Sequence, residues 1–443
     1  MDKHIVLMVA TIGLLAVATI TGPQLLSVEY QGATSLSGET PETIASLPEP
    51  EPVDVREVVE HVPLPEQVKA IYMSACVAGT PSFRHQLVKL AQETEINSIL
   101  IDIKDFSGTI AFPPPTDSIW NGAWQNAECG ARDMKELIQM MHDNDIFVIG
   151  RITVFQDPYL ASVRPDLAVK RADGETVWND YKGLSFIDVG AREYWDYVVE
   201  LTKLSYNLGF DEINYDYIRY PSDGNMQDIT FAHSGTKAKA KNLEEFFQYL
   251  HSQIQDPELY ADVRHENTGR EQPIPYTSAD LFGFTTSNQD DLSIGQIIER
   301  AFPYFDFIAP MVYPSHYPDG HLGYEDPNLY PYEVVYNAMK RGVERAEAET
   351  TQQFSFAHER IGTSTPPIYK KPVYSARNLR TWIQDFDYGG DYDAADVRAQ
   401  FQASYDAGVM DWMIWAPSNI YTREALFGPG HSELSTIATS TTR

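Results

Sequence analysis

The chain has 443 residues, of which 43% are hydrophobic and 12% aromatic, so it can bury a large core and is not a disordered protein. Its 33 Lys and Arg residues stand against 63 Asp and Glu residues. The resulting net charge of -30 repels nucleic-acid phosphates and anionic lipid headgroups, so no nucleic-acid partner is expected and a neutral or cationic ligand is favoured over a polyanion.

Residues 1–26 contain an apolar run over residues 5–20 behind Lys3 and are expected to be a signal peptide or a membrane anchor. Small residues at 16–18 offer a cleavage site, whereas extension of the run through Leu26 would let it span a bilayer. Either outcome predicts an exported protein that touches the membrane only through this segment. Residues 27–66 are rich in Pro, Glu, Ser and Thr and are expected to form a tether.

Beyond the tether, short apolar or β-branched runs alternate with helical patterns. Strands are expected at 68–74, 96–105, 146–155, 210–221, 274–284, 306–314, 379–388 and 408–421. Helices are expected near 82–94, 133–144, 191–207, 237–255, 293–302, 331–347 and 394–406. Eight such units predict an α/β fold, a (β/α)8 TIM barrel over residues 67–425, followed by a tail over 426–443. A doubly wound open sheet is the alternative, but the first strand is not followed by the GxGxxG turn of that fold.

The strand FDEINYDYIRYP, residues 210–221, has two contrasting faces. Period two places Glu212, Asn214 and Asp216 on one face. Ile213, Tyr215 and Tyr217 fall on the other. An edge strand with a solvated face would explain the pattern equally well on composition alone. In a barrel, however, the acidic face points inward, and its last acid reaches the strand end where active sites form.

Further polar and aromatic residues are expected at the same strand ends. The candidates for catalysis are Asp216, Asp280 and Asp385, and the candidates for substrate binding are Asp102, Lys104, Arg151, Arg219, Tyr313, Trp415 and Asn419. Structural ion pairs would explain one or two of the acids, but not four or more at one mouth. Paired carboxylates suit glycosidic bond cleavage, because one protonates the departing oxygen while the other attacks the anomeric carbon or activates water.

Asp216 is expected to be the central carboxylate, Asp280 its acid/base partner and Asp385 a supporting group. Arg219 is expected to keep a nearby carboxylate ionised.

Glu212 lies deeper on the same strand as Asp216 and is expected to be neutralised by Arg151 or Lys104. Aromatic residues on strand ends and loops either stack on sugar rings or fill loop cores; they are Trp120, Trp124, Trp178, Tyr313, Tyr317 and Trp415.

Eight sequence blocks in order carry a resemblance to a known family: KAIYMS, ILIDIKD, IGRITVF, FDEINYDYIRYP, SADLFGF, IAPMVYPSHY, LRTWIQDF and MIWAPSNIY. Over residues 68–421 the chain resembles a glycoside hydrolase family catalogued as a bacterial domain of unknown function, within the TIM-barrel glycosidase superfamily. The resemblance implies acids after strands four, five and seven at Asp216, Asp280 and Asp385. Amylase-like enzymes usually place a Glu after strand five, and Asp280 departs from that pattern.

The resemblance implies a glycoside hydrolase acting on an extracellular or cell-surface polysaccharide. The alternative is a carbohydrate-binding or cell-envelope interaction module that has lost turnover. A polysaccharide deacetylase would need an Asp-His-His metal site, and the strand ends offer none, so neither a metal nor another cofactor is expected. No GxSxG, P-loop or HExxH motif is present.

The two cysteines, Cys76 and Cys129, follow the first strand and precede the second main helix. They are expected on neighbouring units at one face of the barrel, where they either form a disulfide after export or remain two buried thiols.

Overall fold

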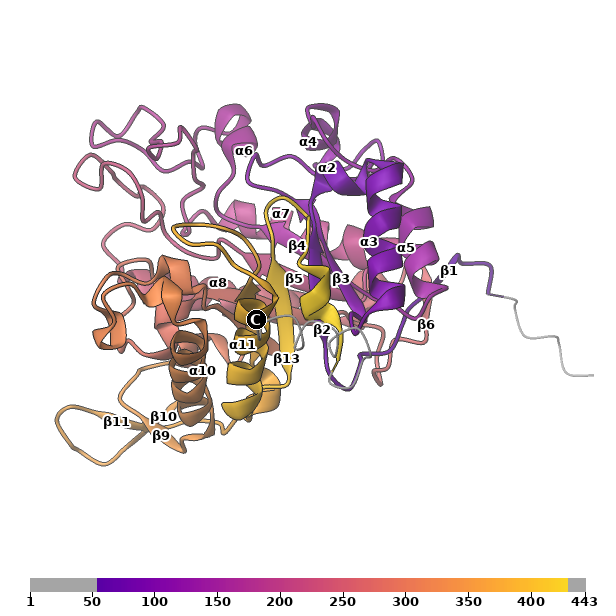
Figure 1. The fold of residues 1–443 in the computed structure, drawn as a ribbon. Coiled ribbons are helices and arrows are strands. Elements are labelled where there is room, and N and C mark those ends of the chain that lie inside the picture. Colours follow the sequence, from indigo (N-terminus) through magenta and orange to yellow (C-terminus); the bar gives the residue numbers. More distant parts are fainter. Residues whose placement is uncertain (1–53, 429–443) are drawn as a thin grey trace, which may run out of the picture. The chain divides into compact units, whose positions relative to one another are not determined.

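The computed structural model describes residues 54–428, and parallel strands within this range close into an eight-stranded barrel (Figure 1). The strands are β2 (Lys69–Met73), β3 (Ser98–Lys104), β4 (Phe147–Thr153), β5 (Glu212–Asp216), β7 (Tyr276–Phe282), β8 (Phe307–Met311), β12 (Arg380–Gln384) and β13 (Asp411–Trp415). Strand β13 pairs with β2, and β12 pairs with both β13 and β8, so the sheet has no open edge. The predicted TIM barrel is confirmed, and all eight expected strands are present.

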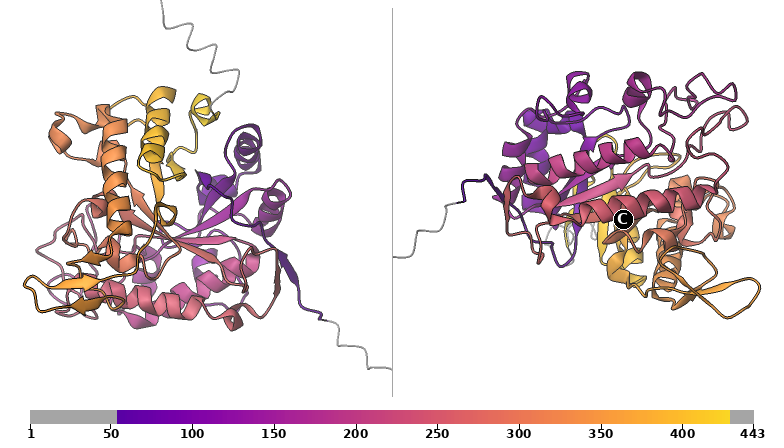
Figure 2. Two further views of the ribbon diagram at one scale, coloured as in Figure 1. Left: turned by 90° about the horizontal axis from the view of Figure 1, so that it is seen from below. Right: turned by 180° about the vertical axis from the view of Figure 1, so that it is seen from behind.

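Helices follow the strands and cover the outside of the barrel (Figure 2). The main ones are α3 (Pro81–Glu93), α5 (Met134–His142), α7 (Arg192–Leu208), α8 (Lys239–Ile254), α10 (Pro331–Glu347) and α11 (Ala394–Asp406), all close to their expected ranges. The helix expected near 293–302 is reduced to α9 (Ile298–Ala301). Leu292 and Ser293 have φ values of 51° and 59°, and this left-handed backbone cannot belong to an α-helix.

Several short elements were not expected because they are too short to show a period. They are α2 (Ala75–Ala78), α4 (Asn121–Gln125), α6 (Pro158–Val163), a small sheet of β9 (Thr350–Thr351), β10 (Glu359–Ile361) and β11 (Ile368–Lys370), and the 3-10 helices η2 (Pro257–Tyr260), η3 (Gly283–Thr286), η4 (Pro314–His316), η5 (His321–Gly323), η6 (Pro327–Leu329), η7 (Ala376–Asn378) and η8 (Arg423–Leu426). None of the helices described in residues 54–428 is long and apolar enough to cross a membrane. The predicted signal or anchor at 1–26 lies outside the described residues.

Side chains on both faces of the strands are buried, and most of them are apolar. Side chains such as Ile99 and Ile213 pack outward against the helices. Leu100, Phe147 and Met413 fill the interior of the barrel instead. The alternation that the sequence showed in β5 therefore separates a helix-facing side from a barrel-facing side, and the edge-strand interpretation is wrong: β5 pairs with β4 and with β7.

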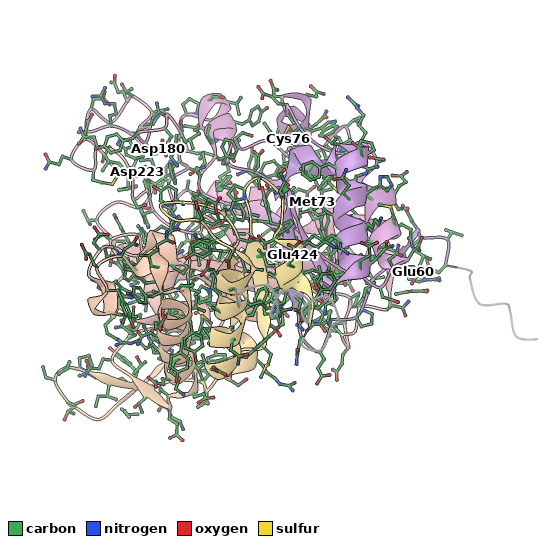
Figure 3. All side chains as sticks on the ribbon, viewed as in Figure 1. Glu60, Met73, Cys76, Asp180, Asp223 and Glu424 are labelled. Carbon is green, nitrogen blue, oxygen red and sulfur yellow. A yellow bond between two sulfur atoms is a disulfide. The ribbon has the colours of Figure 1, made fainter. Side chains whose placement is uncertain are left out.

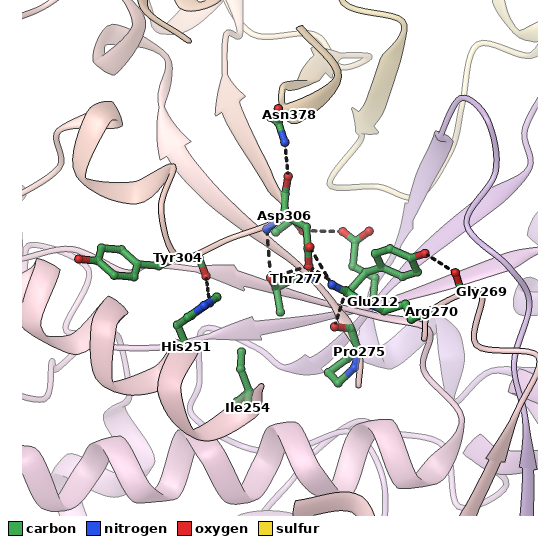
Figure 4. Close-up of polar contacts among 12 residues, drawn as sticks. Glu212, His251, Ile254, Gly269, Arg270, Pro275, Thr277, Tyr304, Asp306 and Asn378 are labelled. Carbon is green, nitrogen blue, oxygen red and sulfur yellow. Dashed lines mark hydrogen bonds and ion pairs between the residues drawn. The ribbon is translucent and has the colours of Figure 1, made fainter. Parts of the chain in front are cut away.

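The amino-terminal ends of the strands are closed by structural contacts. Asp306 accepts hydrogen bonds from both terminal nitrogens of Arg270 at 3.0 Å and from the Thr277 backbone at 2.9 Å (Figure 4). At the same end β1 (Val58–Glu60) pairs in parallel with β6 (Arg264–Glu266). Strand β1 lies within the range predicted as tether, 27–66, and that prediction did not anticipate an ordered strand there. Because Val59 is buried, its apolar side chain holds the strand in place.

Cys76 on α2 and Cys129 in the loop before α5 form a disulfide with a Cα–Cα separation of 4.6 Å. Cys76 follows Met73 at the end of β2, where both are labelled in Figure 3. The bonded alternative of the sequence analysis is therefore the one observed, and the bridge ties together two neighbouring β/α units.

Candidate active site

The carboxylates Asp216 and Asp280 lie at the same level of the barrel mouth. Strands β5 and β7 are parallel neighbours in which Asn214 is paired with Ser278 and Tyr215 with Ala279. Asp216 and Asp280 occupy the next position of this register. Neighbouring strands are about 4.8 Å apart, so two inward side chains at one level must be close.

Asp216 is held in an ion pair that continues across the mouth. Its Oδ2 accepts hydrogen bonds from Arg151 Nη2 at 2.6 Å and Nε at 3.1 Å, while Oδ1 accepts one from the Tyr217 backbone at 2.6 Å. Arg151 Nη1 donates to Asp102 Oδ1 at 2.6 Å, and the Tyr72 hydroxyl donates to Asp102 Oδ2 at 2.5 Å. Burial alone would lower the pKa of Arg151, but the charges of Asp216 and Asp102 raise it well above its usual range. The guanidinium is therefore a permanent cation between two acids.

Asp280 has a different environment. Its Oδ1 accepts hydrogen bonds from Asn214 Nδ2 and from the Trp382 indole, both at 2.8 Å. Its buried Oδ2 has no hydrogen-bond partner in the described part of the chain. Burial raises the pKa of Asp280 well above its usual range, and the negative charge of Asp216 raises it further. Both effects favour the protonated form of Asp280, and Oδ2 is the oxygen that is not occupied by a donor.

Below this level the barrel interior holds a second ion pair. Arg380 Nη1 donates to Glu212 Oε1 at 2.6 Å, and both side chains are fully buried. Ser278 donates to the same Glu212 oxygen at 2.6 Å and accepts from Asn214, which in turn donates to Asp280. The expected partners of Glu212, Arg151 and Lys104, were wrong, because Arg380 projects from the far side of the closed barrel.

A cavity of about 410 Å3 opens over Asp216 and Asp280, and we call it the catalytic cavity. Its size falls in the range of roughly 300–1,000 Å3 that is typical of ligand pockets. Arg151 and Arg219 are among its polar residues. The aromatic residues that line it are Tyr217, Phe282, Phe284, Tyr313, Tyr317, Trp382 and Trp415. Flat apolar faces around a pair of acids suit the faces of sugar rings.

The expected binding residues fall into two groups. Arg151, Arg219, Tyr313 and Trp415 line the catalytic cavity, and Asp102 lines a neighbouring cavity that shares Arg151 with it. Lys104 does not reach either one. It is fully buried and pairs with Asp157 at 3.0 Å, because a β-bulge between Asp102 and Lys104 shifts the register and turns Lys104 toward the helix layer.

Asp385 and Asn419 hold the chain in place rather than lining the catalytic cavity. Asp385 accepts hydrogen bonds from the backbone and hydroxyl of Thr422 at 2.8 and 2.7 Å. Asn419 has a φ of 55° and accepts a hydrogen bond from the Ser74 backbone at 2.9 Å. The structure therefore does not bring Asp385 to the carboxylate pair.

Arg219 interacts with the charge of Asp216 but does not form an ion pair with it. Its guanidinium lies between the rings of Tyr217 and Phe282, at 4.7 and 4.9 Å, and none of the ion pairs formed within residues 54–428 includes it. Arg151 forms the ion pair with Asp216 instead.

Among the candidate stacking residues, Trp120 and Trp178 are buried in loop cores and are not available to a ligand. Trp124 borders the disulfide region rather than the mouth. Tyr313, Tyr317 and Trp415 line the catalytic cavity.

Sequence reasoning did not single out Tyr72, Asn214, Trp382 or His316. Asn214 was placed on the inward face, and Tyr72 and Trp382 occupy inward positions of β2 and β12 that period two could have identified. His316, at the end of η4, also lines the catalytic cavity.

Residues 70–421 match the family model described as "Putative glycosyl hydrolase domain". The chain belongs to this family. The match spans the glycosyl hydrolase domain from β2 to the segment after β13 and confirms the resemblance noted in the sequence.

Solved structures similar to this glycosyl hydrolase domain include a hypothetical protein from Ruminiclostridium thermocellum, with 31% sequence identity and a TM-score of 0.36. The alignment covers 44% of this chain and 95% of that protein. The glycoside hydrolase domain of PgaB (BpsB) from Bordetella bronchiseptica has 11% identity, coverage of 84% and 99%, and a TM-score of 0.49. The α-galactosidase TtGalA from Thermus thermophilus has 10% identity, coverage of 86% and 67%, and a TM-score of 0.45. No curated protein matches the chain.

Proposed function

We propose that this protein is a glycoside hydrolase that cleaves the glycosidic bonds of a polysaccharide with Asp216 and Asp280. The observation that carries the proposal is the contrast between the two carboxyl groups at one level of the mouth: Asp216 is ion-paired with Arg151, whereas burial and Asp216 raise the pKa of Asp280. Two acids in opposite protonation states are what glycoside hydrolysis needs.

Asp280 is the general acid in the proposed mechanism. Its Oδ2 proton goes to the glycosidic oxygen as the bond from that oxygen to the anomeric carbon breaks. Trp382 and Asn214 donate to Oδ1, which fixes the orientation of the carboxyl group and stabilises the carboxylate formed when the proton leaves.

Asp216 is the nucleophile. Its carboxylate attacks the anomeric carbon and forms a glycosyl-enzyme ester, and Asp280 then takes a proton from the water that hydrolyses this ester. Arg151 holds the Asp216 carboxylate in place through two donors. Adjacent positions on neighbouring strands favour the short carboxylate separation of about 5–5.5 Å found in retaining enzymes.

The proposed site of action is outside the cytoplasm. The apolar segment at 1–26 supports export. The disulfide between Cys76 and Cys129 supports it as well, because disulfides persist in oxidising compartments.

The test is Asp216→Asn, with Asp385→Asn as the matched control of a buried acid outside the cavity. Release of reducing ends from a panel of polysaccharides should fall by several orders of magnitude in Asp216→Asn, while binding of the same glycan persists. Asp385→Asn should retain most of the wild-type turnover in whatever fraction folds. A wild-type protein that binds a glycan and never cleaves it is a carbohydrate-binding module, and the hydrolase proposal fails.

A further inference from the structure

The catalytic cavity meets a second cavity along a shared wall. The second cavity has a volume of about 580 Å3 and lies over β2, β3 and β4, whereas the catalytic cavity lies over β5, β7, β8 and β12. Arg151, Tyr217, Arg219 and Trp415 line both. A ligand that occupies the catalytic cavity therefore has a second space of similar size beside it.

The second cavity differs from the first in its chemistry. Its polar residues include Gln156, Lys182 and Asp223, and Asp180 and Asp223 lie beside each other on the loops after β4 and β5 (Figure 3). Neither Asp216 nor Asp280 lines it. Hydrogen-bond donors and acceptors together, away from Asp216 and Asp280, suit the hydroxyl groups of sugars.

Two exposed aromatic side chains lie in or beside these cavities. Phe106 lines the second cavity and is 58% exposed. Tyr388, on the loop after β12, is 65% exposed, and its ring lies 6.0 Å from that of His316, which lines the catalytic cavity. Large aromatic faces left in water next to a ligand site are suited to stacking on further sugar rings.

The charges along the two cavities indicate which sugars fit. Arg151 is paired with two acids, and the second cavity holds the cations Arg219 and Lys182 together with the acids Asp180 and Asp223. The whole chain carries a net charge of -30. A polyanionic glycan would meet like charge, whereas a neutral chain would meet donors, acceptors and aromatic faces.

We propose that the two cavities form one groove across the barrel mouth that binds several consecutive sugars of a neutral polysaccharide, so that cleavage occurs within the chain. This inference rests on the proposed function for the cleavage step only. The carboxylate pair lies on the catalytic-cavity side of the shared wall, Phe106 lines the second cavity, and Tyr388 lies beside His316 of the catalytic cavity.

Binding can be measured without cleavage in the full-length Asp280→Asn protein. The probes are the dimers and hexamers of cellulose, chitin, xylan, mannan and amylose fragments, with the hexamer of polygalacturonate as the anionic control, in titration calorimetry. At least one neutral hexamer should bind about tenfold tighter than its own dimer, and the anionic hexamer should bind more weakly than that neutral one. Equal affinity for dimer and hexamer, or no binding of any neutral hexamer, overturns the groove.

Phe106→Ala and Tyr388→Ala, each made in the Asp280→Asn protein, should lower the hexamer-to-dimer affinity ratio by about threefold to tenfold. The matched control is Phe354→Ala, since Phe354 is 39% exposed and lies after β9, in the segment that joins α10 to β12. It should leave the ratio unchanged. If all three variants behave alike, the aromatic faces do not belong to the groove and the proposal is wrong.

The position of cleavage is determined by incubating the wild-type protein with the longest glycan that binds and analysing the products. Cleavage within the chain should lower the viscosity of the polymer early and yield fragments of several lengths. Release of single sugars from one chain end contradicts internal cleavage. Tight hexamer binding without any cleavage leaves the groove intact and rejects only the hydrolase proposal.

Discussion

At the residue scale, Asp216 and Asp280 have different environments because neighbours reach each acid from different strands. Arg151 on β4 donates twice to Asp216, whereas Asp280 receives only neutral donors, from β5 and β12. This contrast between two carboxyl groups of the same intrinsic chemistry is the basis of the different roles that we propose for them.

Stability should report the neutral state of Asp280. The raised pKa means that folded protein keeps this proton while the unfolded chain releases it above about pH 4, so wild-type stability falls as pH rises from there toward the folded-state pKa. The side chain at position 280 in the Asp280→Asn variant is neutral at every pH, so the variant does not show this fall in stability. Urea unfolding at about pH 5 and about pH 8 should show the variant gaining stability relative to wild type at the higher pH. A difference that does not change with pH would mean that Asp280 is ionised in the folded protein.

The stereochemistry of the product belongs to the same scale. Because Asp216 and Asp280 occupy adjacent positions on neighbouring strands, we expect the product to keep the anomeric configuration of the substrate. Proton NMR of the first product formed, before mutarotation, measures this directly. An inverted product would require a water between the two groups and a separation of about 6.5–9.5 Å.

At the element scale, the disulfide joins α2 to the loop before α5 and so links the first two β/α units. The bridge spans 53 residues of sequence. Disulfides typically stabilise a protein by about 2–4 kcal/mol, and the chain-entropy relation for a loop of this length gives the upper end of that range. The free energy of unfolding of Cys129→Ser, measured with urea in the absence of reductant, should be lower than that of the wild type by this amount.

Wild-type protein unfolded in the presence of reductant is the control for Cys129→Ser and should match it. The catalytic cavity should stay functional in the folded variant, since neither cysteine lines it. Equal stability of wild type and variant without reductant would show that the bridge does not constrain the chain.

At the scale of the whole molecule, we propose that the protein is exported, on the basis of the apolar segment at 1–26. A phosphatase reporter that is active only outside the cytoplasm, fused after Arg443, should be active in a bacterial host. Deletion of residues 1–26 should abolish that activity. A fusion that is active only with a cytoplasmic reporter would place the site on the other side of the membrane.

The sequence by itself determined the barrel, its eight strands, and the inward position of Glu212, Asn214 and Asp216. These features depend on the local spacing of apolar residues, which can be read from short segments of the sequence. It also identified Asp216 and Asp280 as the candidate pair. Each lies near the carboxyl end of its strand, and the two strands are neighbours in the barrel.

Only the tertiary structure decided which groups pair. Arg380 reaches Glu212 across 168 residues of sequence, and Trp382 reaches Asp280 across 102. One bulge removed Lys104 from the mouth. Such partners are set by the closure and stagger of the whole barrel, and a shift of one residue in a strand reverses the direction of a side chain, so no local pattern contains them.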